Sequence, residues 1–223
     1  MEKEQTEKVF IALDNMSASR ARNIIEKYKD KVHGFKVNHL LMHDLAPFDN
    51  LNIFLDLKLW DIPNTVKNGI EAIADLNPYF TTIHITGGDE MQKIANLSKK
   101  NVKVLGVSIL TSIDSAQSEK YYSEKNINNL VGKFVKNALE NKLDGVVCSP
   151  LEIELVKQIS SGKLIIVTPG IRPENYNKND DQKRFMSPKK AVNLGANYLV
   201  IGRPITQSSN PLSEITSINS SIE

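Results

Sequence analysis

Short apolar segments recur at nearly regular intervals along the chain. Most of them are continuously apolar rather than alternating with polar residues. A continuous apolar run of this length is typical of a strand that is buried on both faces of a parallel sheet. We therefore predict eight strands, at Val9 to Leu13, Phe35 to Val37, Ile53 to Leu55, Thr82 to Ile85, Val102 to Ser108, Gly145 to Cys148, Leu164 to Val167 and Tyr198 to Ile201.

Amphipathic segments with the apolar spacing of a helix lie between these runs. The clearest are Ser17 to Tyr28, Pro63 to Leu76, Ile127 to Leu139 and Ser187 to Leu194. Ser17 is expected to cap the first of them. Ser187 and Pro188 are an N-cap and a first helical residue for the last, which is expected to end before Gly195.

The alternation of strands and helices predicts an α/β protein. Eight units in 223 residues amount to about 28 residues per unit, which favours a single (β/α)8 TIM barrel formed by residues 1–223. A doubly wound open sheet uses the same alternation, but no G-x-G-x-x-G follows the first strand. The long irregular segment 170–186 is expected to be a functional loop, because structureless loops of this length are uncommon in compact domains.

Composition and charge narrow the classes of function. The chain has 28 basic and 26 acidic residues, so it lacks the dense positive charge of a nucleic-acid-coating protein. Cys148 is the only cysteine, which excludes an internal disulfide and a cysteine-based zinc site. The N-terminus is charged, and no stretch approaches the roughly 20 apolar residues of a membrane span. These features predict a soluble, cytoplasmic protein.

Polar residues gather where the predicted strands end. In a barrel, these carboxyl ends open on one face, where such enzymes have their active sites. Several charged residues that are separated in the sequence are therefore expected to meet at the mouth of the barrel, the opening at the carboxyl ends of the strands. The residues concerned are Asp14, Lys36, Asp56, Lys58, Thr111, Pro169, Gly170, Gly202 and Arg203.

The segment from Asp56 to Thr65 is the densest of these polar groups. Residues two apart on a strand share a face, so Asp56 and Lys58 are expected to project together. Lys36 on the neighbouring strand and Asp61 would extend them into an alternating chain of charges, in which each ion is paired. The alternative from spacing alone is a structural ion-pair network beneath a loop.

A second group has the composition of a phosphate site. Gly202 and Arg203 follow the eighth strand, where barrels often bind phosphate. Glycine lets backbone N–H groups approach an anion, and arginine can clamp it with two hydrogen bonds. Arg172 and Gln182 on the long loop could close over the same anion. A glycine turn with a solvated arginine is the alternative.

Two further residues are expected to have ordinary roles. His84 lies on a buried strand and is interpreted as a hydrogen-bonded core or interface histidine. Cys148 is interpreted as a small buried hydrophobic residue.

Taken together, the motifs resemble the orotidine 5′-phosphate decarboxylase family, over nearly the whole chain and in the same order. The residues that carry the resemblance are Ala12-Leu13-Asp14, Phe35-Lys36, Asp56 to Thr65, Leu110-Thr111-Ser112, Pro169 to Pro173 and Val200 to Thr206. The combination of D-x-K-x-x-D-I-P-N-T with P-G-I-R-P and I-G-R-P-I-T is much more specific than any one motif. Trp60 departs from it, since many family members have histidine there.

This resemblance implies a (β/α)8 barrel that works as a homodimer, without a metal or an organic cofactor. It implies decarboxylation of orotidine 5′-monophosphate to uridine 5′-monophosphate and CO2, the last step of de novo UMP synthesis. Lys58 would protonate C6 within a network of Lys36, Asp56, Lys58 and Asp61, and Asp56 would lie beside the substrate carboxylate. Substrate binding would involve Asp14, Lys36, Ile62, Thr65, Thr111, Pro169, Arg172, Gln182, Gly202 and Arg203, with Asp61, Ile62 and Thr65 completing the partner subunit's site.

Three other functions remain open from the sequence. Sister enzymes of the same barrel group, such as keto-gulonate phosphate decarboxylases and hexulose phosphate synthases, share the D-x-K-x-x-D pattern. They use magnesium and have an acidic residue where Lys36 stands. A Schiff-base aldolase acting through Lys58 is disfavoured by the flanking aspartates, which would keep that amine charged. A nucleotide-binding barrel without catalysis is the remaining alternative.

Overall fold

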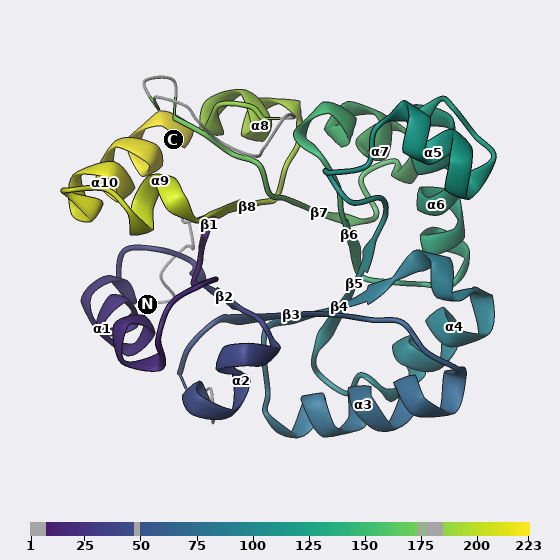
Figure 1. The fold of residues 1–223 in the computed structure, drawn as a ribbon, viewed down its shortest axis with the longest axis horizontal. Coiled ribbons are helices and arrows are strands. Elements are labelled where there is room, and N and C mark those ends of the chain that lie inside the picture. Colours follow the sequence, from purple (N-terminus) through teal and green to yellow (C-terminus); the bar gives the residue numbers. More distant parts are fainter. Residues whose placement is uncertain (1–7, 47–49, 174–175, 177–184) are drawn as a thin grey trace.

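Eight parallel strands form a closed barrel in the computed structural model, which describes residues 8–46, 50–173, 176 and 185–223. The strands are β1 (Val9–Ala12), β2 (Gly34–Val37), β3 (Ile53–Leu59), β4 (Phe80–His84), β5 (Lys103–Val107), β6 (Gly145–Val147), β7 (Ile165–Thr168) and β8 (Tyr198–Ile201). Each strand pairs with its neighbours in sequence, and β8 pairs with β1 to complete the ring (Figure 1). All eight predicted strands and the (β/α)8 fold are confirmed.

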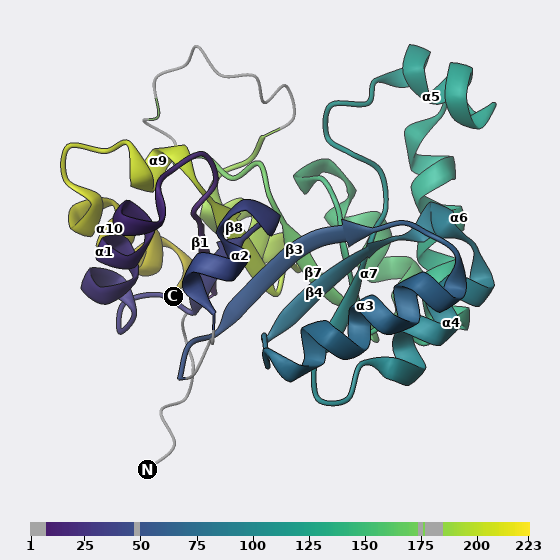
Figure 2. The same ribbon diagram turned by 60° about the horizontal axis from the view of Figure 1, so that its bottom comes forward.

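Helices surround this ring on the outside (Figure 1). They are α1 (Ala18–Tyr28), α2 (His39–Leu45), α3 (Pro63–Asp75), α4 (Asp89–Ser98), α5 (Ser115–Tyr122), α6 (Ile127–Glu140), α7 (Ile153–Ser160), α8 (Pro188–Leu194), α9 (Arg203–Thr206) and α10 (Pro211–Ile222). The four predicted helical segments correspond to α1, α3, α6 and α8. Helices α2, α4, α5, α7, α9 and α10 were not among the predicted segments. Helix α5 is polar, buries only Ser118 and projects above the barrel (Figure 2). No helix among the described residues is long and apolar enough to span a membrane.

The predicted helix ends are confirmed, although one cap differs in detail. The Ser17 side chain accepts a hydrogen bond from the Arg20 N–H, as expected for an N-cap. Ser187 occupies the N-cap position of α8, but its side chain makes no capping hydrogen bond. Gly195 ends α8 with a φ of 120°, a left-handed conformation that glycine adopts without steric cost.

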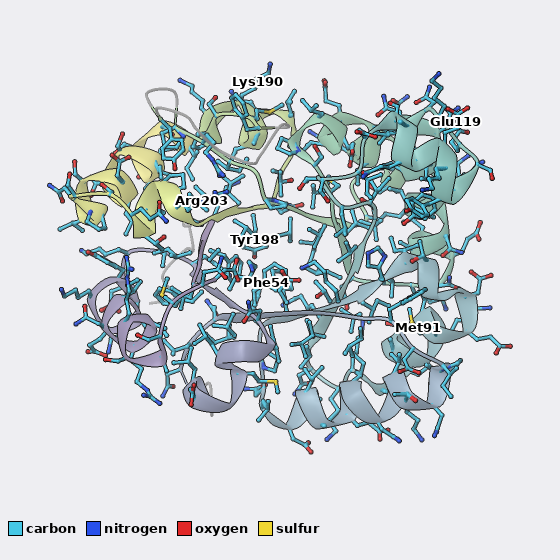
Figure 3. All side chains as sticks on the ribbon, in the orientation of Figure 1. Phe54, Met91, Glu119, Lys190, Tyr198 and Arg203 are labelled. Carbon is cyan, nitrogen blue, oxygen red and sulfur yellow. The ribbon has the colours of Figure 1, made fainter. Side chains whose placement is uncertain are left out.

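The barrel interior is filled by aromatic side chains in the half nearer the amino ends of the strands. Phe10 packs edge-to-face on Phe54 with the ring centroids 5.8 Å apart, and Tyr198 lies 5.6 Å from Phe10. Figure 3 shows Phe54 and Tyr198 inside the ring of strands. The hydroxyls of Tyr79 and Tyr198 are 3.0 Å apart, so these partly buried side chains hydrogen-bond to each other. Above this packing, a cavity remains at the carboxyl ends of the strands.

Strand β3 contains an irregularity directly below the barrel mouth. Leu55 pairs with Thr81 and Leu59 pairs with Ile83, so three residues of β3 lie opposite Thr82 alone. The chain accommodates this bulge by placing Lys58 at a φ of 52°, in the left-handed region that side chains other than glycine seldom adopt. Such backbone strain is concentrated at functional sites in proteins.

Candidate active site

A cavity of about 400 Å³ opens at the carboxyl ends of the strands, within the usual range for small-molecule sites. Phe54, Val107, Val147 and Val200 give it an apolar lining, while the polar and charged residues come from several strand ends. The predicted residues that line the cavity are Asp14, Lys36, Asp56, Lys58, Thr111, Pro169, Arg172, Gly202 and Arg203. The expected convergence of the strand ends on one mouth is confirmed for these residues.

Three of the four predicted network residues form a connected ion-pair chain. Lys36 Nζ lies 2.9 Å from both carboxylate oxygens of Asp14 and 3.3 Å from Asp56 Oδ2. Lys58 Nζ lies 2.8 Å from the same Asp56 oxygen. The side chains of Lys36 and Asp56 are nearly buried, whereas the Lys58 side chain is 38% exposed and borders the cavity. Lys58 is therefore the more accessible of the two ammonium groups to a bound molecule.

The surroundings of Asp56 keep its carboxyl group ionised. Burial alone would raise its pKa, but the charges of Lys36 and Lys58, with hydrogen bonds from Lys58 and Thr82, hold the pKa below its ordinary value. A fixed negative charge therefore persists at the base of the cavity. Any ligand carboxylate placed beside it would experience strong repulsion.

Asp61, Ile62 and Thr65 do not line the cavity of their own chain. All three are exposed, and the Asp61 carboxylate accepts a hydrogen bond from the Ile62 N–H at 2.7 Å. Asp61 makes no ion pair with the described residues of the same chain. Of the four residues predicted to form the network, Lys36, Asp56 and Lys58 are connected within one chain and Asp61 is not. Asp14 is an additional member of the connected chain.

The predicted anion-binding residues that the structure describes line the same cavity as Lys58. Gly202 and Arg203 begin the short helix α9 and line the cavity. Figure 3 shows Arg203 beside this helix, at the rim of the barrel. Arg172 also lines the cavity, but its side chain is buried. Its guanidinium donates a hydrogen bond to the carbonyl of the preceding residue, Ile171, at 2.9 Å. Gln182 lies outside the described residues.

The two ends of the long loop after β7 are joined at the barrel. Gly170 turns the chain with a φ of 76°, and Ile171 forms a parallel bridge with Met186. The Arg172 N–H donates to the Met186 carbonyl at 2.9 Å, and the Met186 N–H donates to the Gly170 carbonyl at 3.2 Å. Pro169 and Arg172 are fixed at the cavity wall by this closure.

Sequence reasoning missed several polar residues at the site, among them Arg20 and Thr82. Arg20 lines the cavity and donates to the Thr206 carbonyl at 2.7 Å, which ties α1 to α9. Thr82 is fully buried and contacts both Asp56 and the Lys58 backbone. The sequence does contain a signal for Thr82, which is a hydroxyl residue on an otherwise apolar strand. Thr82 lies two residues before His84, and residues two apart on a strand point to the same face. Nothing in the local sequence distinguishes Arg20.

His84 and Cys148 are placed as expected. His84 is partly buried, and its Nδ1 lies 3.1 Å from the Thr86 hydroxyl. Burial, and to a smaller extent the charge of Lys58, lowers the His84 pKa. Cys148 is buried and borders the apolar part of the cavity. The described residues include no group of three or more His, Cys, Asp or Glu that could hold a metal ion.

Comparison with known proteins gives consistent matches across the chain. Residues 7–218 match the model of the "Orotidine 5′-phosphate decarboxylase / HUMPS family". The orotidine 5′-phosphate decarboxylase of Carboxydothermus hydrogenoformans is 41% identical, covering 92% of this chain and 91% of its own. That of Dictyoglomus thermophilum is 38% identical, covering 96% and 95%. The crystal structure of the enzyme from Lactobacillus acidophilus aligns with a TM-score of 0.82 at 31% identity, covering 97% and 99%.

Proposed function

The chain belongs to the orotidine 5′-phosphate decarboxylase / HUMPS family, and from this premise we propose that it decarboxylates orotidine 5′-monophosphate. The products are uridine 5′-monophosphate and CO2, which makes the chain a carboxy-lyase of the last step of de novo UMP synthesis, in the cytoplasm. Residues 1–223 act as one catalytic domain. The observation that supports this reaction best is the Lys58 ammonium, held 2.8 Å from the ionised Asp56 at the cavity wall.

The reaction needs a proton donor and a stabilising charge at one carbon atom. The bond between C6 and the carboxylate breaks, and its electron pair stays on C6. The Lys58 ammonium stabilises this negative charge without reorganising solvent, then donates its proton to C6 and regains one from water. Asp56 repels the substrate carboxylate, and this repulsion disappears as CO2 leaves. Lys36 keeps the Asp56 charge in place.

The other parts of the substrate meet the remaining cavity residues. Asp14, which also pairs with Lys36, binds a ribose hydroxyl, and Thr111 contacts the pyrimidine. The phosphate is bound by Gly202 and Arg203, with Pro169, Arg172 and Gln182 contributed by the loop after β7. Binding energy from this remote phosphate positions the base for reaction.

We further propose that the active unit is a homodimer. Trp60 and Ile62 are each 68% exposed in the single chain and flank Asp61. Large apolar side chains around a carboxylate are typical of a surface that is covered by another protein. In the dimer, Asp61 reaches the Lys58 ammonium of the partner's site, while Ile62 and Thr65 contact the partner's substrate.

The magnesium-dependent sugar-phosphate enzymes of the same barrel group are the nearest alternative. The position of Lys36 argues against them, because its ammonium already bridges the carboxylates of Asp14 and Asp56. A divalent cation between these two carboxylates would have to displace this buried charge. A metal-free reaction is therefore the better fit to the residues present.

The experiment is to mix the purified protein with orotidine 5′-monophosphate and excess chelator and to follow the loss of the orotate absorbance. Loss of absorbance with stoichiometric uridine 5′-monophosphate supports the proposal. No loss with chelator, but turnover of a sugar phosphate after addition of magnesium, would assign the chain to the alternative. Binding of the nucleotide without turnover would indicate a barrel without this catalytic activity.

A further inference from the structure

The β3 bulge leaves the backbone of Lys58 outside the regular ladder. Three residues of β3 lie opposite Thr82 alone, so Lys58 lies within the bulge and has no partner in the regular pairing with β4. The Lys58 N–H donates to the Thr82 hydroxyl oxygen at 2.8 Å. Thr82 thereby supplies a side-chain acceptor to the backbone of the residue with a φ of 52°.

The same hydroxyl also determines how the Asp56 carboxylate is oriented. Since the Thr82 oxygen accepts from an N–H, its own proton is available for donation, and Asp56 Oδ1 receives it at 3.0 Å. Asp56 Oδ2 is then the oxygen that meets Lys58 at 2.8 Å and Lys36 at 3.3 Å. One carboxylate oxygen is held by the hydroxyl, and the other is held by the two ammonium groups.

We propose that Thr82 is a positioning residue for the reaction, which it serves by fixing both the Lys58 backbone and the Asp56 carboxylate. This inference deepens the proposed function and rests on it. Thr82 is fully buried beneath the two groups and does not line the cavity, so it acts through them. Without its hydroxyl, the Lys58 N–H loses its acceptor and Asp56 Oδ1 loses its donor. Both groups can then move away from the reacting carbon.

Strand β4 provides a matched control in the preceding residue. Thr81 is equally buried, and its hydroxyl donates to the Leu55 carbonyl at 3.1 Å, away from the ion-pair chain. Thr81→Val and Thr82→Val therefore remove the same atom from the same strand. Only Thr82→Val removes a hydroxyl that contacts the ion-pair chain. Thr82→Ser keeps the hydroxyl and serves as the rescue variant.

The experiment compares kcat and the affinity for uridine 5′-monophosphate in these variants. Thr82→Val is expected to lower kcat about 10- to 100-fold, the loss expected for a hydrogen bond to a charged group, with affinity changed by less than about twofold. Thr81→Val and Thr82→Ser are expected to keep kcat within about threefold of wild type. Wild-type kcat in Thr82→Val, or an equal loss in Thr81→Val, would overturn the inference. If Thr82→Val does not fold, Thr82→Cys makes the same comparison, because a thiol is a weak donor and acceptor.

A second measurement separates this inference from the proposed function. The 13C signal of the Asp56 carboxyl group reports its titration without any substrate. The Asp56 carboxyl group is faced by Lys36 from β2 and by Lys58 from its own strand, and both lysines remain in every variant. Thr82→Val is expected to raise the Asp56 pKa, whereas Thr81→Val is expected to leave it unchanged. An unchanged Asp56 titration in Thr82→Val contradicts the inference. A wild-type protein that is inactive on orotidine 5′-monophosphate contradicts the proposed function instead.

Discussion

Lys36 and Lys58 come from neighbouring strands and place their ammonium groups on the same oxygen, Asp56 Oδ2, at 3.3 and 2.8 Å. The two cations are not equivalent. The side chain of Lys36 is 10% exposed and also bonds to Asp14, whereas that of Lys58 is 38% exposed. Lys36 therefore fixes the carboxylate, and Lys58 is left as the cation that can transfer a proton to a ligand.

Replacement of Lys58 tests this division of roles. Lys58→Ala is expected to abolish turnover of orotidine 5′-monophosphate, because the proton donor and the charge that stabilises C6 are both lost. Binding of uridine 5′-monophosphate should remain within about tenfold of wild type, since the phosphate end is unchanged. Steady-state kinetics and calorimetry measure the two effects.

Lys67→Ala is the control for this substitution. Lys67 lies on α3, is partly exposed and pairs with Glu71 at 3.9 Å, so its removal should leave kcat unchanged. Substantial residual turnover in Lys58→Ala would contradict the assignment of Lys58 as the proton donor.

The sequence predicted the strands and most of the charged residues of the site because both depend on local patterns. Continuous apolar runs identify buried strands, and the ends of parallel strands must meet at one face of a barrel. The spacing of Asp56 and Lys58 also predicted that they share a face. They do meet, but at a bulge with Lys58 in the left-handed region, and not on a regular strand. That geometry depends on the register with β4, which the β3 sequence does not encode.

Other features could not be predicted because they depend on distant segments. The bond from Arg20 to the Thr206 carbonyl joins residues 186 positions apart, and the sequence around Arg20 resembles any exposed helix start. The spacing of D-x-K-x-x-D placed Asp61 in the charge chain, but within one chain it is exposed and outside that chain. Its proposed position in a partner's site depends on contacts between two chains, which local spacing does not encode.

Arg203 is expected to act on the phosphate group alone. Arg203→Ala should lower kcat/KM for orotidine 5′-monophosphate by roughly 100-fold or more, because a charge-assisted contact with the phosphate is lost. Turnover of orotidine, which lacks the phosphate, should change by less than about threefold. Arg22→Ala is the control, because Arg22 is exposed on α1, does not line the cavity and donates to the Asp44 carbonyl. An equal loss on both substrates would contradict the phosphate assignment.

The depressed pKa of His84 predicts a pH-dependent stability. Burial and the charge of Lys58 disfavour the protonated ring in the folded state, so its pKa lies below the ordinary histidine value of 6.5. The unfolded chain therefore binds the proton more readily, and stability is fully present above pH 6.5 and decreases as the pH falls toward the folded pKa. Urea unfolding at several pH values from 8 to about 5 measures this decrease.

His84→Asn isolates the contribution of this ring. The variant should lose less stability than wild type over the same acid range, because asparagine does not titrate there. The other histidines remain in both proteins, so their effects cancel in the comparison. Identical pH dependence of the two proteins would contradict the assignment.

The shared active site is tested most directly by mixed dimers. Lys58→Ala and Asp61→Asn are each expected to be inactive alone. In a hybrid of the two chains, one site combines the intact Lys58 of the second chain with the intact Asp61 of the first. Random assembly makes half of the dimers hybrids, each with one intact site, so about one quarter of the wild-type activity should return. Coexpression with two different affinity tags allows the hybrids to be isolated.

The matched control is Lys58→Ala mixed with Asp56→Asn, which should stay inactive because these two residues pair within one chain. Activity no greater than the sum of the separate variants in the first mixture would show that Asp61 does not act across the interface.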